Sequence, residues 1–402
     1  MKITDVEAII LRQPVLDDGI ADGSQDDLVI RVHTDEGIVG IGEVDSAPEA
    51  VLALVTAPGS HAIANSFHSL LVGEDPRDVE RLWQKMYRGM NYIGRRGIAL
   101  HAQSGIDIAL WDILGKLHEV PVHELLGGPV RDRVRAYVWI AGDDLCDFSA
   151  QEIVEETLPW VEQGFTAFKL TPPKAYAVDL PSHGPAIVDR LTALREAIGP
   201  DRDIALDVHG HWSKTMARRL FPALEPLDLL FVEEPVLAEN LHIVRELTQS
   251  TSLPIATGER LYSRWEFVDV VQSGVAVVQP DVSQAGGISE LRRIAALAET
   301  YDVTVAPHCP LGPVTLAASL QIDFATPNIL IQEQSITFFG DEFLRYVKNP
   351  EVFDFHDGCW KRPTGHGLGV QIDEKVVEEM AAIGHDRKQH IWWHTDGSYA
   401  EF

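Results

Sequence analysis

The sequence is poor in cysteine. It has three cysteines in 402 residues, Cys146, Cys309 and Cys359, and no two of them form a CxxC pair. An odd number of widely spaced cysteines argues against a disulfide framework and against a structural zinc site. The chain is therefore expected to work in a reducing compartment.

Long apolar segments are also missing. No run approaches the roughly 18 residues that a membrane-spanning helix needs. The opening segment MKITDVEAII has neither the hydrophobic stretch nor the cleavage site of a secretory signal. These absences predict a cytoplasmic protein with no membrane partner.

Positive charge is the third scarcity. Lysine and arginine number 33 against 61 aspartates and glutamates, which gives a formal net charge of -28. This charge opposes non-specific binding to nucleic acid or to an anionic membrane, so neither is expected as a partner. The excess acid fits a solvated surface or an adaptation to salt, and an anionic substrate would need a local source of positive charge.

What the chain does contain is enough for a large folded core. Hydrophobic residues make up 45% of it and charged residues 23%, with no repetitive tract. Because a (β/α) barrel alone takes about 250 residues, the simplest division is one barrel domain plus a smaller domain.

The N-terminal part is typical of a mixed α and β unit. Residues 1–60 alternate as strands do, which predicts a small antiparallel sheet with a turn at residues 35–37. The glycines in GIVGIG do not follow the GxGxxG order, so they are interpreted as hairpin glycines rather than a nucleotide-binding loop. From residue 75 to about 126 the apolar period becomes helical, and the helix containing HAQSGIDIALWDILGKL is expected to stop near Gly127 and Gly128.

Beyond GGPVRDRV, eight short apolar strands recur, each followed by a helical segment. Eight such units predict a closed parallel barrel. Titratable residues lie near the carboxyl ends of six consecutive candidate strands, 22 to 27 residues apart: Asp207, Glu233, Glu259, Asp281, His308 and Glu333. Because these strand ends form the active-site face of a barrel, the six side chains are expected to converge.

Three converging carboxylates need compensation. Two carboxylates about 4 Å apart repel by about 4 kcal/mol at an effective dielectric near 20. A divalent cation held by Asp207, Glu233 and Glu259 would reverse the sign, and three oxygen ligands favour Mg²⁺ over zinc. The alternative is a salt-bridge network with Arg260 and Lys169.

Two histidines are expected at the same face. Asp207 and His209 stand two residues apart in LDVHGHW, so His209 should point into the cavity while Val208 packs outward. On the far side, Asp281 is expected to orient the ring of His308 and raise its basicity.

Several segments carry a resemblance that covers essentially the whole chain: LWDILGKL, LLGGPVRDRVRAY, LDVHG, FVEEPVLAEN, QPDVSQAGGI and APHCPLGP. In them the sequence resembles the enolase superfamily, with its mandelate racemase and muconate lactonizing enzyme relatives, and most of all the acid-sugar dehydratases that act on galactonate. The resemblance implies a modified (β/α) barrel closed by an α+β cap. The cap would comprise residues 1–126, the barrel 127–350, and residues 351–402 would return to the cap.

The resemblance also implies roles for named residues. Mg²⁺ would be held by Asp207, Glu233 and Glu259. Asp281 and His308 would form the general base, His209 would be the general acid, and Glu333 would contact the substrate. Lys169 is expected to supply positive charge near the substrate carboxylate, and His211 to contact substrate.

One absence sharpens the expected reaction. Racemases and cycloisomerases of this superfamily typically carry a second lysine two residues after the first, whereas here Lys169 is followed by Leu170 and Thr171. A base on the seventh strand and an acid on the third favour loss of the C2 proton and the C3 hydroxyl, which yields a 2-keto-3-deoxy acid.

Other functions stay open. They are another superfamily reaction, namely racemisation, epimerisation or cycloisomerisation, and a non-catalytic binding protein of the same fold. The HGH of residues 209–211 also resembles zinc amidohydrolases, but it falls on the third strand rather than the first. The substrate is expected to be D-galactonate or a related aldonate, selected by residues 15–27 and by the segment TPPKAYAVDLPSHG. A homo-oligomer is expected from the family.

Overall fold

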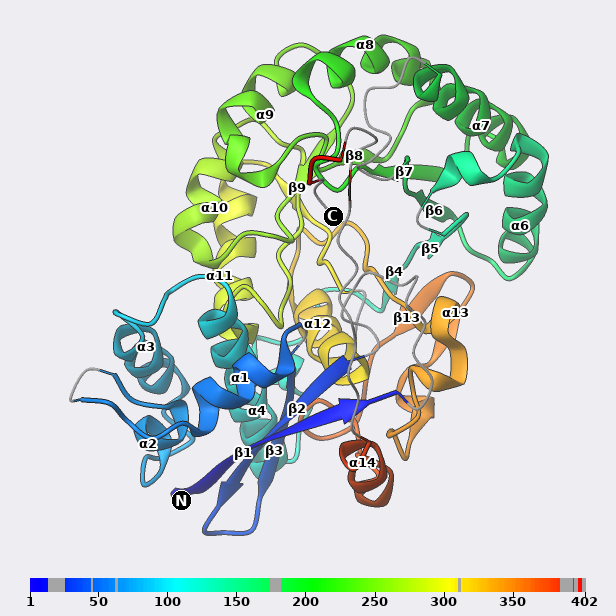
Figure 1. The fold of residues 1–402 in the computed structure, drawn as a ribbon. Coiled ribbons are helices and arrows are strands. Elements are labelled where there is room, and N and C mark those ends of the chain that lie inside the picture. The colour runs from blue at the N-terminus through cyan, green and yellow to red at the C-terminus, as the bar shows by residue number, and fades with distance from the viewer. Residues whose placement is uncertain are drawn as a thin grey trace.

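The computed structural model describes residues 1–13, 26–44, 46–61, 64–142, 144–173, 182–309, 312–383, 393 and 397–399 (Figure 1). Most of the two segments expected to select the substrate, and most of the tail after residue 383, lie outside this part of the chain.

The N-terminal sheet has three antiparallel strands in chain order, as the alternating pattern predicts. They are β1 (Ile3–Arg12), β2 (Asp26–Thr34) and β3 (Val39–Val44). Five helices follow: α1 (Pro48–Thr56), α2 (Phe67–Leu71), α3 (Val79–Gly89), α4 (Ile98–His118) and α5 (Val122–Leu125). Helix α1 lies in a region that the sequence pattern assigned to strands.

Helix α4 lies directly on β3. A Cβ added at Gly40 would be 2.1 Å from the carbonyl oxygen of Ala109, and one at Gly42 would be 1.9 Å from that of Gly105. These two glycines therefore allow helix packing and are not hairpin residues; only Gly37, with φ 80°, serves the turn. The other side of α4 packs on a barrel helix, so the helix is buried nearly all round.

The predicted end of this helix is wrong by several residues. Helix α4 stops at His118, where Glu119 takes a left-handed conformation, and α5 forms separately after Pro121. Gly127 and Gly128, both with positive φ, follow α5 instead. Proline fixes its own φ and restricts the residue before it, which accounts for the earlier break.

The barrel contains seven named parallel strands in unbroken order from β5 to β11. They are β5 (Val138–Trp139), β6 (Ala167–Leu170), β7 (Asp203–Asp207), β8 (Phe231–Glu233), β9 (Ile255–Thr257), β10 (Val277–Val278) and β11 (Thr304–Val305). Residues 329–332 close the ring as the eighth segment, because Ile329 bridges Val305 and Gln332 bridges Ala136, both in parallel. The predicted barrel is thus confirmed.

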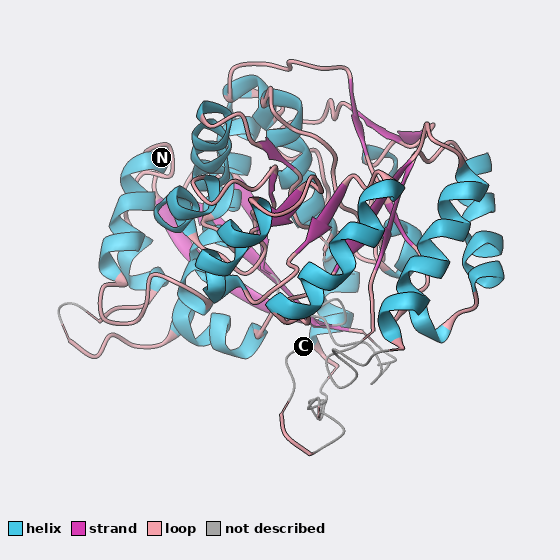
Figure 2. Cartoon of the chain, turned by 90° about the horizontal axis from the view of Figure 1, so that it is seen from above, coloured by secondary structure: helices cyan, strands magenta, loops and turns pink. Residues whose placement is uncertain are grey.

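The barrel interior has one apolar residue from each of the eight segments: Tyr137, Ala167, Ala205, Phe231, Ala256, Val277, Ala306 and Ile331. Each strand leads into an outer helix, and Figure 2 shows helices around the central strands. The outer helices are α6 (Ala150–Glu162), α7 (His183–Ile198), α8 (Lys214–Leu224), α9 (Leu241–Thr248), α10 (Ser263–Val271), α11 (Gly287–Thr300), α12 (Pro313–Ala325) and α13 (Ile336–Phe339).

The C-terminal segment joins both parts of the molecule. Strands β12 (Phe355–His356) and β13 (Cys359–Lys361) extend a small sheet with β4 (Arg133–Arg135), and α14 (Glu374–Ala381) packs on β1. None of the helices in the described ranges is long and apolar enough to cross a membrane.

Candidate active site

The predicted acidic residues gather at the carboxyl ends of adjacent strands. Asp207 ends β7 and pairs in register with Glu233, which ends β8, and both side chains are fully buried. Glu259 follows β9 by two residues and is 7% exposed. The parallel register of the barrel therefore brings together residues that the sequence places 26 apart.

Lys169 on β6 is the cation inside this cluster. Its Nζ lies 2.9 Å from Asp207 Oδ2, 3.3 Å from Glu233 Oε2 and 2.6 Å from Glu333 Oε1, and its side chain is fully buried. Burial alone would lower the pKa of Lys169, but the three carboxylates raise it well above its ordinary value. The salt-bridge network considered from the sequence is therefore present, with one ammonium group facing three carboxyl groups.

The network leaves acidic oxygens uncompensated. Glu233 Oε1 and Glu259 Oε2 are buried and accept no hydrogen bond from the described residues, whereas Asp207 Oδ2 already faces the Lys169 ammonium. Burial and the charge of Asp207 raise the pKa of Glu233 well above its ordinary value, so repulsion within the cluster is strong. This surplus of hard oxygen donors in a dry site suits a divalent cation.

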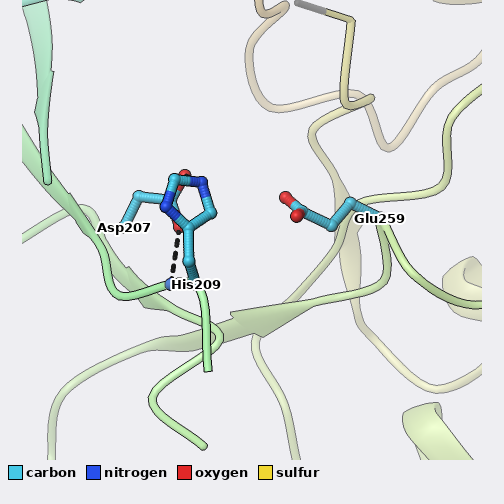
Figure 3. A group of neighbouring side chains, drawn as sticks. All are labelled: Asp207, His209 and Glu259. Atoms are coloured by element: carbon cyan, nitrogen blue, oxygen red, sulfur yellow. Dashed lines mark hydrogen bonds and ion pairs between the residues drawn. The ribbon is translucent and has the colours of Figure 1, made fainter. Parts of the chain in front are cut away.

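The side chains that could share one ion differ in part from the predicted trio. One ligand atom each from Asp207, His209 and Glu259 lies within 4.8 Å of the others (Figure 3). In Figure 3 the Glu259 carboxylate points from the opposite side toward Asp207 and the ring of His209. Glu233 is not in this group, and its Oε2 lies 3.3 Å from Lys169 Nζ.

His209 reaches the site through a backbone bend. Strand β7 ends at Asp207, and His209 has φ 51°, so the extended spacing of two residues is not what directs its ring. Val208 is fully buried, as expected. His209 Nε2 lies 3.2 Å from Asp207 Oδ2. Burial lowers the pKa of His209, but Asp207 outweighs it and the net shift is upward.

The predicted contact between Asp281 and His308 is present. His308 Nδ1 lies 2.8 Å from Asp281 Oδ2, while the other Asp281 oxygen accepts from the backbone N–H and the hydroxyl of Ser283, both at 2.6 Å. His308 Nε2 lies 3.7 Å from Glu259 Oε2. Burial lowers the pKa of His308, but Glu259, Glu333 and Asp281 together raise it well above its ordinary value.

The two imidazoles come from opposite sides of the barrel. His209 follows β7 and His308 follows β11, and these strands are four positions apart in a ring of eight. Asp207 stands beside the first ring and Glu259 beside the second. An acid and a base could therefore act on two faces of one molecule bound between them.

Glu333 and His211 also border the site. Glu333 bridges Lys169 and the backbone N–H of Cys309, which donates to Glu333 Oε2 at 2.9 Å. The ring of His211 is 6.0 Å from that of His209.

One further residue, Glu234, was missed from the sequence, and it pairs with Arg260, which the salt-bridge alternative had named. Arg260 Nε lies 3.1 Å from Glu234 Oε2 and 3.3 Å from Glu259 Oε1, and burial followed by the charge of Glu259 raises the pKa of Glu234 to about 8. The doublet in FVEEP was the available signal for Glu234. In an extended strand it would face outward, but its φ of 36° turns it inward.

Comparison with known families and proteins agrees with this architecture. Residues 10–127 match the model of the mandelate racemase / muconate lactonizing enzyme N-terminal domain, and residues 152–376 match the enolase C-terminal domain-like model. Curated proteins named D-galactonate dehydratase, from Variovorax paradoxus and Ralstonia nicotianae, are each 44% identical over 93% of this chain and 96% of their own length.

Solved structures give the same result. A mandelate racemase/muconate lactonizing enzyme from Sulfitobacter sp. has a TM-score of 0.83 at 31% identity, covering 96% of this chain and 97% of its own. A mandelate racemase/muconate lactonizing enzyme-like protein from Rubrobacter xylanophilus has a TM-score of 0.81 at 32% identity, covering 94% and 97%.

Proposed function

The chain belongs to the mandelate racemase and muconate lactonizing enzyme family of the enolase superfamily, and on that premise we propose that it dehydrates D-galactonate or a related aldonate. The product is the 2-keto-3-deoxy acid, which makes the protein a carbon-oxygen lyase. The observation that carries the proposal is the pair of imidazoles on opposite strands, His308 hydrogen-bonded through Nδ1 to Asp281 and His209 paired through Nε2 with Asp207.

His308 is the proposed base. The bond between Asp281 and Nδ1 keeps a proton on that nitrogen and leaves Nε2 to accept the proton from C2. His209 is the proposed acid on the other face. As the C3–O bond breaks, the departing oxygen takes the proton of His209 and leaves as water, and the resulting enol becomes the ketone.

Mg²⁺ is the proposed cofactor, held by Asp207 and Glu259, whose ligand atoms already lie within 4.8 Å of each other, and by Glu233, which would have to move its carboxylate from Lys169 toward the ion. The buried Oε1 of Glu233 and Oε2 of Glu259, which have no hydrogen-bond partner among the described residues, are hard donors of the kind that Mg²⁺ prefers. When bound, the ion would stabilise the negative charge that collects on the substrate carboxylate as C2 loses its proton. Lys169, Glu333 and His211 are the proposed substrate contacts, and Lys169 supplies the positive charge that an anionic substrate needs.

Racemases and cycloisomerases of this superfamily typically carry a second lysine, two residues after the first, as the base on the second face. Position 171, two residues after Lys169, is a buried threonine, whose hydroxyl does not serve as that base. Dehydration is therefore favoured over epimerisation.

The test is a panel of hexonates and pentonates incubated with the protein and Mg²⁺, with keto-deoxy product measured colorimetrically and by NMR in D₂O. A dehydratase releases keto-deoxy product from galactonate or a close relative and loses this activity in EDTA. If an epimer forms without loss of water, the proposed reaction is wrong and the protein is an epimerase. If no acid sugar gives either product, a non-catalytic binding protein is favoured.

The organisation of the protein is part of the same proposal. A cap of residues 1–126, a barrel of 127–350 and a returning segment of 351–402 form a cytoplasmic homo-oligomer without nucleic-acid or membrane partners. The three free cysteines and the charge of -28 support this setting. Light scattering after gel filtration measures the oligomer.

A further inference from the structure

The two helices that follow the strands of the proposed base dyad lack caps of their own. Helix α11 comes after Asp281 and helix α12 after His308, and their N-cap residues are Gly286 and Gly312, which have no side chain to offer. The first backbone N–H groups of a helix need an acceptor from elsewhere. Elsewhere in the barrel, Ser149 caps α6 from its own sequence.

For α12 the acceptor comes from the N-terminal sheet. Glu43 on β3 accepts the backbone N–H of Thr315, the third residue of α12, with its Oε2 at 2.6 Å. A Cβ added at Gly312 would lie 2.1 Å from the carboxyl carbon of Glu43. The glycine therefore makes room for a carboxylate 272 residues away in the chain.

For α11 the acceptor comes from the long helix of the N-terminal part. Asp107 on α4 accepts the backbone N–H of Ser289, the third residue of α11, at 2.9 Å, and lies 2.7 Å from its hydroxyl. A Cβ at Gly287 would be 2.4 Å from Asp107 Oδ2. Ser104 of the same helix accepts the N–H of Gly286 at 2.9 Å. The arrangement at α12 is thus repeated at α11, where Asp107 of α4 supplies the carboxylate in place of Glu43.

Glu43 is itself held in place. Its side chain is buried, and its second oxygen accepts from the hydroxyl of Tyr346, which also contacts Asp27 Oδ2 at 2.6 Å. Burial and the neighbouring Glu43 raise the pKa of Asp27 well above its ordinary value. Three distant segments thus fix the position of one carboxylate.

We propose that Glu43 and Asp107 are positioning residues for the base dyad: each caps, from the N-terminal part, the helix that follows one member of the pair. His308 precedes α12 by five residues, and Asp281 precedes α11 by six, with the backbone N–H of Ala285 bonded to the Asp281 carbonyl at 2.8 Å. Loss of either cap releases the first turn of its helix and moves the adjoining member of the dyad. This inference rests on the proposed function, because it assigns His308 as the base.

The variants are Glu43→Ala, Glu43→Gln and Asp107→Ala, with Ser149→Ala as the matched control. Ser149→Ala removes the side-chain cap of α6, the helix that follows β5 and neither strand of the dyad. The readouts are kcat, KM, the primary isotope effect with substrate deuterated at C2, and the melting temperature.

Glu43→Ala and Asp107→Ala should lower kcat about 10- to 100-fold with little change in KM, because a displacement near 1 Å costs up to about 10² in rate. The isotope effect should rise, since proton removal becomes slower than the other steps. Glu43→Gln should recover much of the rate because its amide oxygen still accepts from Thr315. Ser149→Ala should lower the melting temperature while leaving kcat and the isotope effect unchanged.

A second readout needs no substrate. The low-field proton NMR signal of the Nδ1–H between His308 and Asp281, identified by its loss in His308→Asn, should shift or broaden in Glu43→Ala and Asp107→Ala but not in Ser149→Ala. An unchanged signal and isotope effect in folded Glu43→Ala would overturn the inference, and so would equal changes in Ser149→Ala. If wild type dehydrates no acid sugar, the proposed function fails, and the NMR comparison still decides whether the caps position the dyad.

Discussion

The two flanks of the site are built in different ways. On the His209 flank, the strand, the bend and the following helix belong to one continuous stretch, and α8 is capped by its own Ser213, whose hydroxyl accepts the N–H of Met216 at 3.1 Å. On the His308 flank, the following helix is capped by Glu43 from β3. Among the described residues, the cap of α8 thus comes from the barrel sequence itself, whereas the cap of α12 comes from the N-terminal part.

This difference gives the N-terminal domain a second proposed role, which is to hold the base dyad in position. A domain that encloses a barrel face excludes water and contacts substrate. Both of these effects act equally on the two flanks. Carboxyl groups that cap α11 and α12 act on one flank only. The proposed proton removal should therefore depend on cap docking more strongly than proton donation does.

The largest effect should come from removing each imidazole in turn. His308→Asn and His209→Asn should each lower dehydration about 10³-fold, since a general acid or base contributes about 10²- to 10⁴-fold. They should differ in D₂O. His209→Asn still removes the C2 proton and returns deuterium, whereas His308→Asn exchanges nothing, as followed by loss of the C2–H signal in the NMR spectrum.

The control for this pair is metal content and melting temperature, which should stay near wild type in His308→Asn. Exchange retained in His308→Asn and lost in His209→Asn would reverse the assignment of the two flanks. Equal loss of exchange in both would remove the distinction between them.

A smaller effect should come from filling the space that Glu43 occupies. Gly312 has φ -92° and ψ 163°, which any residue adopts, so Gly312→Ala strains only the contact with the carboxylate. The expected loss is about 1 to 3 kcal/mol of unfolding free energy, measured by urea denaturation. In Glu43→Ala the same change should cost less, because its partner is gone.

Gly184→Ala is the control for the double-mutant cycle formed by Gly312→Ala and Glu43→Ala. There a Cβ would lie 2.9 Å from Leu220 Cδ2, the flexible end of a side chain, so its cost should be the same with or without Glu43. Additive effects of Gly312→Ala and Glu43→Ala would mean that the contact between them is not what holds α12.

The sequence predicted the His209 flank and the barrel well because their information is periodic and local. Six titratable residues at strand ends, spaced by one strand and helix unit each, placed Asp207, Glu259 and His308 on one face. The structural reason given for His209 was wrong, because its own left-handed backbone conformation, and not strand alternation, directs its ring into the site.

The caps could not be predicted in this way. In GIGEV, Glu43 looks like an ordinary strand residue, and the glycines before it were interpreted as hairpin glycines. Its partner at Thr315 is 272 residues away, and no local period links them. Likewise, the turning of Glu233 toward Lys169 depends on the balance of charges in the folded cluster. Long-range electrostatic contacts of this kind appear only when the chain is folded.

The last effect is on stability alone and concerns Asp107, whose buried position raises its pKa from 3.8 to about 7. Below pH 4 the carboxyl group is protonated in both the folded and unfolded states. Between pH 4 and 7 the unfolded state ionises while the folded state keeps its proton, so stability falls as pH rises, by up to about 1.4 kcal/mol per unit. A protonated Asp107 still accepts from Ser289 through its carbonyl oxygen, so the cap persists over this range.

Asp107→Asn keeps that carbonyl oxygen and removes the titration. Relative to wild type, the variant should be least stable at pH 5 and should gain on wild type at pH 6 and again at pH 7, as measured by urea denaturation at each pH. Ser149→Ala, which removes a cap without removing a titrating group, should run parallel to wild type. A difference between Asp107→Asn and wild type that stays constant from pH 5 to 7 would mean that Asp107 is already ionised at pH 5. The α11 cap would then be an ion throughout, as strong at pH 5 as at pH 7, and the His308 flank would have no pH-dependent support from the N-terminal part.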